Sequence, residues 1–107
     1  MHTITETERD IPVIADVDIC VLGGSCTGVF ASVRAARLGA KVAIVGRQNR
    51  FGGTATTGLV NVWRSLYDEV GEKKIIGGMT EEVIERLKKR DAVVVNDDSP
   101  HQYAVVQ

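Results

Sequence analysis

Short apolar runs alternate with polar or glycine-rich stretches along the chain, and the spacing of the apolar residues predicts the elements. Residues 18–22 form an apolar run that predicts a strand, and residues 41–45 predict a second strand, parallel to the first and buried on both faces. Between them, residues 29–38 place small apolar side chains at helical spacing, and Gly39 is a typical stop signal. A βαβ crossover of about thirty residues is therefore expected.

The second half of the chain predicts shorter elements. Residues 61–67 alternate at period two, and we expect residues 72–76 to pair with them as a hairpin. The other predicted elements are a turn at 68–71, a helix over 81–90 with Thr80 as its N-cap, and strands at 92–95 and 103–106 separated by a turn at 96–100. The predicted fold class is α/β, a parallel sheet with an added hairpin.

The turn between the first strand and its helix is made of small residues and predicts a phosphate site. Its residues are Gly23, Gly24, Ser25, Cys26, Thr27 and Gly28. Free backbone N–H groups and the positive end of the dipole bind anions at a helix N-terminus. Against the dinucleotide pattern GxGxxG, Ser25 stands where the backbone comes closest to a pyrophosphate. Its hydroxyl is expected to donate to a phosphate oxygen, provided that its φ is not positive.

A second feature concerns the ribose of such a nucleotide. An Asp or Glu at the end of the second strand usually binds the ribose hydroxyls, but here Gly46 and Arg47 follow the strand. One interpretation is that Arg47 faces a 2′-phosphate, as in an NADP site. The other, which we favour, is that backbone groups and water hold the ribose, with Arg47 along the adenine edge or in solvent.

A second glycine cluster, residues 52–58, contains no bulky or charged side chain. A backbone of this kind approaches a ligand closely, and its threonine hydroxyls are hydrogen-bond donors. The residues singled out are Gly52, Gly53, Thr54 and Thr56. The alternative is a flexible surface loop.

Charge and cysteine content limit the function. The formal net charge of -1 gives no electrostatic reason to expect nucleic acid or an anionic membrane as a partner, and no apolar run reaches the roughly 20 residues of a membrane span. The polar, acidic N-terminus resembles neither a secretory signal nor a transit peptide, so a cytoplasmic protein is expected. Cys20 is predicted to be buried in its strand, and Cys26 to contact cofactor phosphates. No metal site and no catalytic acid, base or nucleophile is predicted.

Several stretches together resemble one family. Residues 4–16, 18–28, 35–42 and 51–60 are similar to the N-terminal part of the FAD-dependent oxidoreductase family, relatives of the glutathione-reductase-like flavoproteins. The resemblance implies a Rossmann-type FAD-binding domain in which the turn at 23–28 holds the pyrophosphate. It also implies that the glycines and threonines of the second cluster lie beside the pyrophosphate and the ribityl or flavin end of FAD.

In that family FAD takes a hydride from a small organic substrate. The resemblance implies that residues 1–107 are the N-terminal part of the domain, incomplete at the C-terminus, and that a later segment or a second chain completes the flavin site. The chain alone is then expected to bind FAD poorly and to expose apolar edges. Two alternatives stay open: a noncatalytic nucleotide-binding or interaction module that is a degenerate remnant, and an NAD(P)-binding domain.

Overall fold

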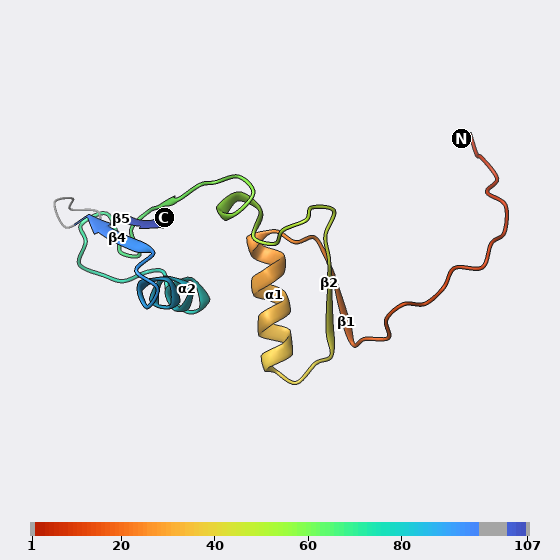
Figure 1. Ribbon diagram of the computed structural model, residues 1–107, viewed down its shortest axis with the longest axis horizontal. Helices are drawn as coiled ribbons and strands as arrows, with labels where there is room; N and C mark the ends of the chain where they lie inside the picture. Colours follow the sequence, from red (N-terminus) through yellow and green to blue (C-terminus); the bar gives the residue numbers. More distant parts are fainter. Residues whose placement is uncertain (1, 97–102, 107) are drawn as a thin grey trace.

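The computed structural model describes residues 2–96 and 103–106 (Figure 1). Residues 2–17 run to the first strand without helix or strand structure. A βαβ unit follows, made of β1 (Ile19–Leu22), α1 (Cys26–Arg37) and β2 (Val42–Val45). The two strands pair in parallel, from Ile19 opposite Val42 to Leu22 opposite Val45, and α1 lies against one face of the pair. The predicted α/β class and the predicted crossover are confirmed.

Burial of these strands differs from the prediction. Cys20 is exposed, and Leu22 and Val45 have exposed fractions of 82% and 54%. Side chains alternate between the two faces of a strand, and Val21 lies close to Gly28 of α1, so Cys20 and Leu22 lie on the opposite face. No described element covers that face, and the predictions that both faces of the strands and Cys20 are buried are wrong.

Helix α1 begins at Cys26, earlier than the predicted start at residue 29. The reason is the side chain of Ser25, which acts as the N-cap: its Oγ accepts a hydrogen bond from the Gly28 N–H at 3.2 Å. The last residues of the glycine turn therefore already belong to the first turn of the helix. At the other end, Gly39 has a φ of +95°, so the predicted stop is confirmed.

The second half of the chain contains a short 3₁₀ helix, a second helix and a second sheet. These elements are η1 (Gly53–Ala55), β3 (Val62–Trp63), α2 (Met79–Lys88), β4 (Val93–Asn96) and β5 (Tyr103–Val106). The second sheet is antiparallel with the order β3-β5-β4, which confirms the two C-terminal strands. Of the predicted turn at 96–100, residues 97–100 lie outside the described residues.

The predicted hairpin of residues 61–67 and 72–76 is wrong in its pairing. β3 pairs with β5 instead, whereas the two predicted strands meet near their turn, through a bridge between Tyr67 and Lys74 and hydrogen bonds from the Ile75 and Ile76 N–H groups to the Leu66 carbonyl at 2.9 and 3.0 Å. The turn itself forms, because the Asp68 Oδ1 accepts hydrogen bonds from the N–H groups of Glu72 and Lys73 at 3.0 and 3.2 Å. β5 lies between β3 and β4, so the backbone groups of β3 are used by a strand distant in sequence.

Helix α2 also begins earlier than predicted. Its N-cap is Gly78, with a φ of +66°, so Thr80 lies within the first turn and is not the cap. The reversal of the chain at Gly78 needs a conformation that glycine adopts without strain, and it fixes the start of the helix. Glu81 and Glu82 still occupy the positive end of the dipole, as expected, and Ile84 is buried with an exposed fraction of 5%.

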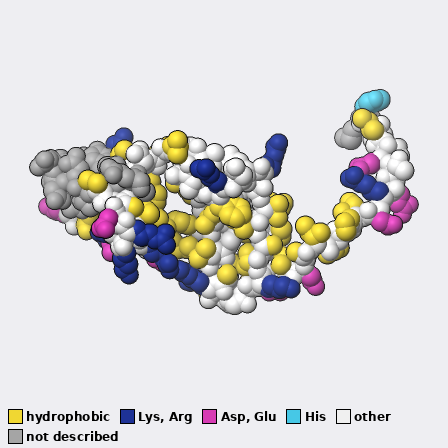
Figure 2. Space-filling model, viewed as in Figure 1, with side chains coloured by type: hydrophobic (Ala, Val, Ile, Leu, Met, Phe, Trp, Pro, Cys, Tyr) yellow, Lys and Arg dark blue, Asp and Glu magenta, His cyan; other side chains and the backbone are white. Residues whose placement is uncertain are grey.

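The molecule is extended. Its radius of gyration is 19.2 Å, whereas a compact chain of this length has about 13 Å. Figure 1 shows α1 between the β1–β2 pair and the part that holds α2, β4 and β5, and Figure 2 shows hydrophobic side chains along the extended N-terminal segment. Among the described residues, no helix is long and apolar enough to cross a membrane.

Candidate functional site

A depression of about 330 Å³ lies at the turn between β1 and α1. Its lining comes from this turn, from the residues that follow β2 and from the second glycine cluster. The lining residues are Gly23, Gly24, Ser25, Gly46, Arg47, Gln48, Arg50 and Gly53. The structure therefore brings together predicted site residues from three separate stretches of the sequence.

Short backbone contacts hold these stretches together. The Gly52 N–H donates to the Gly24 carbonyl at 2.8 Å, and the Gly23 N–H donates to the Val45 carbonyl at 2.7 Å. The Cys26 thiol donates to the Gly52 carbonyl at 2.8 Å. These bonds fix the second glycine cluster and the end of β2 against the turn, so the shape of the depression is set by backbone.

The turn presents hydrogen-bond donors to the depression. The N–H groups of Gly24 and Ser25 have no acceptor among the residues that the structure describes. Ser25 has a φ of −68°, so it occupies its position without strain, and its hydroxyl proton is still available although its oxygen accepts from Gly28. The positive end of the twelve-residue helix α1 adds to this field. The arrangement suits an anion.

The charged residues that line the depression are all positive. Arg47 and Arg50 line the depression, and no Asp or Glu does. Within the described part of the chain, neither guanidinium takes part in an ion pair. An arginine fork donates to phosphate oxygens in bidentate fashion. The residues therefore fit a diphosphate, whereas Gly46 offers no carboxylate to ribose hydroxyls.

Sequence reasoning gave no site role to Gln48, Arg50 or Phe51. A Cβ on Gly24 would lie 2.5 Å from the Phe51 Cδ1, and one on Gly46 would lie 3.4 Å from its Cε1. The half-exposed ring of Phe51 therefore lies against both glycines beside the depression. The available signal was the position of these residues between the second strand and the second glycine pair, which the fold brings to the turn.

Other predicted site residues do not line the depression, and their contact with a cofactor stays a prediction. These residues are Cys26, Thr27, Gly28, Gly52, Thr54 and Thr56. The Cys26 thiol is bonded to Gly52, and the Thr56 Oγ1 donates to the Phe51 carbonyl at 2.6 Å. Gly28 is buried against Gly23. These contacts shape the walls of the site.

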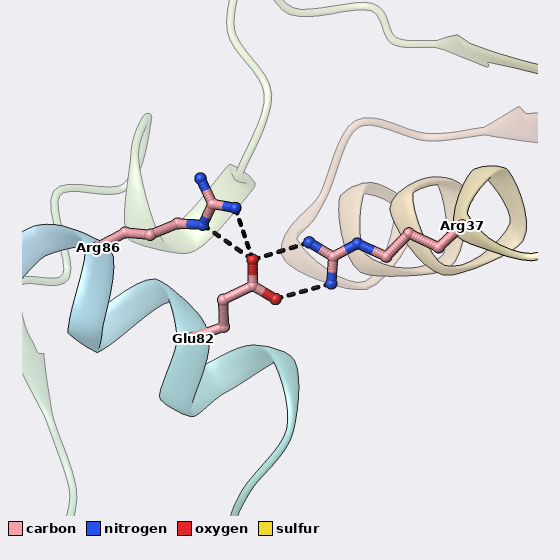
Figure 3. A network of polar contacts seen from close by, with 3 residues as sticks. All are labelled: Arg37, Glu82 and Arg86. Atoms are coloured by element: carbon pink, nitrogen blue, oxygen red, sulfur yellow. Dashed lines mark hydrogen bonds and ion pairs between the residues drawn. The ribbon is translucent and has the colours of Figure 1, made fainter.

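Two other hollows have a different character. The larger, about 600 Å³, follows the charged side of α2 and its C-terminal end and contains no glycine turn. The other, about 300 Å³, lies between α1 and α2 beside an ion-pair network in which Glu82 contacts Arg37 and Arg86 (Figure 3). Hydrogen bonds from Arg37 and then from Arg86 lower the pKa of Glu82 to about 2. This network joins two helices, so we assign it a structural role.

Comparison with known proteins identifies the family. A family model for FAD dependent oxidoreductases matches residues 18–106, which extend from the residue before β1 to the end of β5. No curated protein and no solved structure matched the chain. The family match includes every residue that lines the depression. The chain belongs to the FAD dependent oxidoreductase family.

Proposed function

We propose that residues 1–107 are the N-terminal part of an FAD-binding Rossmann-type domain, and that the depression holds the diphosphate and the adenosine ribose of FAD. One observation carries the proposal: the depression joins the glycine turn, the end of β2 and the second glycine cluster, with arginine as the charged residue in its lining. Dinucleotides bind at such a crevice beyond the carboxyl ends of parallel strands.

The residues of this chain would bind and orient the cofactor. The bare backbone at Gly23 and Gly24 allows close approach of the diphosphate, and the N–H groups of Gly24 and Ser25 would donate to its oxygens. Arg47 and Arg50 would offset its charge. When bound, FAD supplies the redox chemistry by accepting a hydride from a small organic substrate.

The uncovered face of the β1–β2 pair supports the proposal that another segment or a second chain completes the domain. Leu22 and Val45 expose apolar surface there, and a parallel pair is normally covered on both faces. The free thiols of Cys20 and Cys26 suit a reducing compartment, and we place the protein in the cytoplasm.

Ligand-induced stabilisation of the folded chain tests the cofactor. A ligand that binds only the folded state stabilises it by about 1.4 kcal/mol at ten times its Kd. Although the chain alone is expected to bind FAD poorly, we expect FAD in large excess over the chain to raise its Tm, and Gly46→Leu to remove this effect. The Gly46 backbone is unstrained and its Cβ would make ordinary contacts, so a leucine fills the depression without breaking the fold.

The matched control is Gly77→Leu, which adds the same side chain outside the lining of the depression, where its Cβ would make an ordinary contact of 3.7 Å with the Glu81 Oε2. It should retain the FAD response. A shift with NADP and none with FAD would instead support an NAD(P)-binding domain. If FAD, NADP, NAD and ADP all leave the Tm unchanged, the noncatalytic module is the better description.

A further inference from the structure

The depression is lined by polar side chains and bare glycines. Its lining residues, as far as the structure describes them, are four glycines, Ser25, Gln48 and two arginines. The adenine of a nucleotide has flat, largely apolar faces, and ligand sites meet such a group with hydrophobic or aromatic side chains. The apolar contact for a base would therefore come from a side chain that lies beside this lining.

Phe51 lies at this place. A Cβ on Gly24 would lie 2.5 Å from the Phe51 Cδ1 and 3.1 Å from its Cε1, and one on Gly46 would lie 3.4 Å from the same Cε1. One edge of the ring is therefore packed against two glycines that line the depression. The residue nevertheless has an exposed fraction of 49%, so much of an aromatic side chain is left accessible to a ligand.

The backbone on both sides of this ring is fixed. The Thr56 Oγ1 donates to the Phe51 carbonyl at 2.6 Å, and the N–H of the next residue, Gly52, donates to the Gly24 carbonyl at 2.8 Å. The Cys26 thiol donates to the Gly52 carbonyl at 2.8 Å. Because the segment that carries the ring is already held against the turn, a contact between the ring and a ligand costs little ordering of the chain.

The ring also lies beside the position of the missing acid. Dinucleotide sites usually carry an Asp or Glu at the end of the second strand, where it binds the ribose hydroxyls. Here β2 ends at Val45 and Gly46 follows. A glycine gives the ribose no charge-assisted hydrogen bond, so the base becomes the part of adenosine that this end of the depression can hold.

We propose that Phe51 binds the adenine of FAD, and that the depression recognises the adenosine end through the base and not through the ribose hydroxyls. The ligand class is an adenine nucleotide whose diphosphate lies on the glycine turn and whose base packs on the ring. The inference rests on the proposed function, because it takes the depression as the diphosphate site. It adds an apolar contact that the turn and the arginines do not provide.

The test compares the Kd values of three ligands for the full chain, measured by NMR titration. The ligands are ADP, 2′-deoxy-ADP and ribose 5-diphosphate, which lacks the base. We expect ADP to bind roughly tenfold more tightly than ribose 5-diphosphate, because the contact between base and ring is added to the phosphate contacts. The 2′-deoxy compound should bind as tightly as ADP. If it binds about tenfold more weakly, the ribose is recognised and the proposal is wrong.

Variants of Phe51 separate contact with the base from support of the turn. Phe51→Ala should weaken ADP binding roughly tenfold and leave ribose 5-diphosphate binding unchanged, whereas Phe51→Tyr keeps the ring and should keep the affinity for ADP. Phe51→Leu keeps apolar volume against the two glycines without the flat ring, and it should also lose affinity for ADP alone. Equal losses for both ligands, or no loss for ADP, would overturn the proposal.

The matched control is Ile76→Ala, which removes an apolar side chain of similar exposure, 41%, outside the lining. It should bind all three ligands as the wild type does. Circular dichroism of each variant establishes that the chain is folded.

FAD titrated in the same way separates the two proposals. If FAD binds and Phe51→Ala binds ADP as the wild type does, the role of Phe51 is wrong and the proposed function stands. If ADP binding depends on Phe51 but FAD does not bind, the contact with adenine stands and the proposed function is wrong. If neither FAD nor ADP binds, both are wrong.

Discussion

Gly28 shows how one residue connects the fold to the site. A Cβ at this position would lie 1.9 Å from the Gly23 carbonyl oxygen and 3.5 Å from the Val21 Cγ1. The N-terminus of α1 can therefore lie this close to β1 only without a side chain at Gly28. The same helix end provides the field for the proposed diphosphate. Close packing and anion binding therefore both depend on the absence of a side chain at Gly28.

Gly28→Ala should destabilise the βαβ unit. The new methyl group meets backbone, which cannot rotate away, so we expect a loss of about 3 kcal/mol in the free energy of unfolding. Urea unfolding followed by circular dichroism measures this loss. Gly24→Ala is the control: the atoms nearest to its Cβ would belong to the ring of Phe51, a side chain that can move. Equal losses for the two variants would contradict the packing argument.

The site was predictable from sequence where backbone conformation determines it. The glycine spacing and the small residues indicated the turn, and Gly39 indicated the helix end, because glycine has local conformational consequences. The roles of Arg50 and Phe51 were not predictable. They depend on the chain after β2 folding back to the turn, where Gly52 bonds to Gly24.

At the scale of elements, a carboxylate links two helices that are distant in sequence. Arg37 of α1 donates to both carboxylate oxygens of Glu82 in α2 at 2.7 Å, and Arg86 contacts the same carboxylate at 2.8 Å (Figure 3). The helices also leave a hollow of about 300 Å³ between them. These hydrogen bonds link α1 to α2 beside the hollow.

Acid should weaken the contact between Arg37 and Glu82 as the pH falls from about 4.5 to about 2. The folded-state pKa of Glu82 is about 2, below the ordinary value of 4.5. The unfolded chain then binds more protons in this interval, so the stabilisation is complete above about pH 4.5 and is lost as the pH falls through about 2. The Tm of Glu82→Gln should lie below that of the wild type at pH 6, and the two should converge near pH 2.

Glu85→Gln is the matched control for this measurement. Glu85 pairs with Lys88, which also lowers the pKa of Glu85, but both residues belong to α2. Its loss affects one helix and leaves the contact with α1 intact. We expect a smaller change in Tm for Glu85→Gln than for Glu82→Gln at pH 6. A larger change would mean that the Arg37 contact contributes little to stability, as exposed ion pairs often do.

Local patterns predicted the existence of the elements better than their partners. The hydrophobic spacing indicated the βαβ unit because helix, strands and glycines are all close in sequence. For residues 61–67 the alternation indicated a strand, but the choice between residues 72–76 and the distant β5 is not encoded locally. Nor does a charge pattern such as Arg37 with Glu82 show which helices will meet.

At the scale of the whole molecule, apolar surface is unevenly covered. One face of the β1–β2 pair packs on α1, whereas Leu22 and Val45 are exposed on the strands. Figure 2 shows further hydrophobic side chains along the N-terminal segment, where Ile11, Val13 and Ile14 are exposed. Exposed apolar side chains that lie together in a patch mark a contact site.

Thiol labelling of Cys20 measures whether the open face is free in solution. Cys20 is exposed on the face opposite α1, whereas Cys26 is partly buried and donates to Gly52. In a Cys26→Ser chain, Cys20 should react with a maleimide at nearly the rate of the urea-unfolded chain, because exposure controls access to the thiolate. In a Cys20→Ser chain, Cys26 should react more slowly. Protection of Cys20 that disappears on dilution would show that a second copy covers this face, and protection at all concentrations would mean that the chain itself covers it.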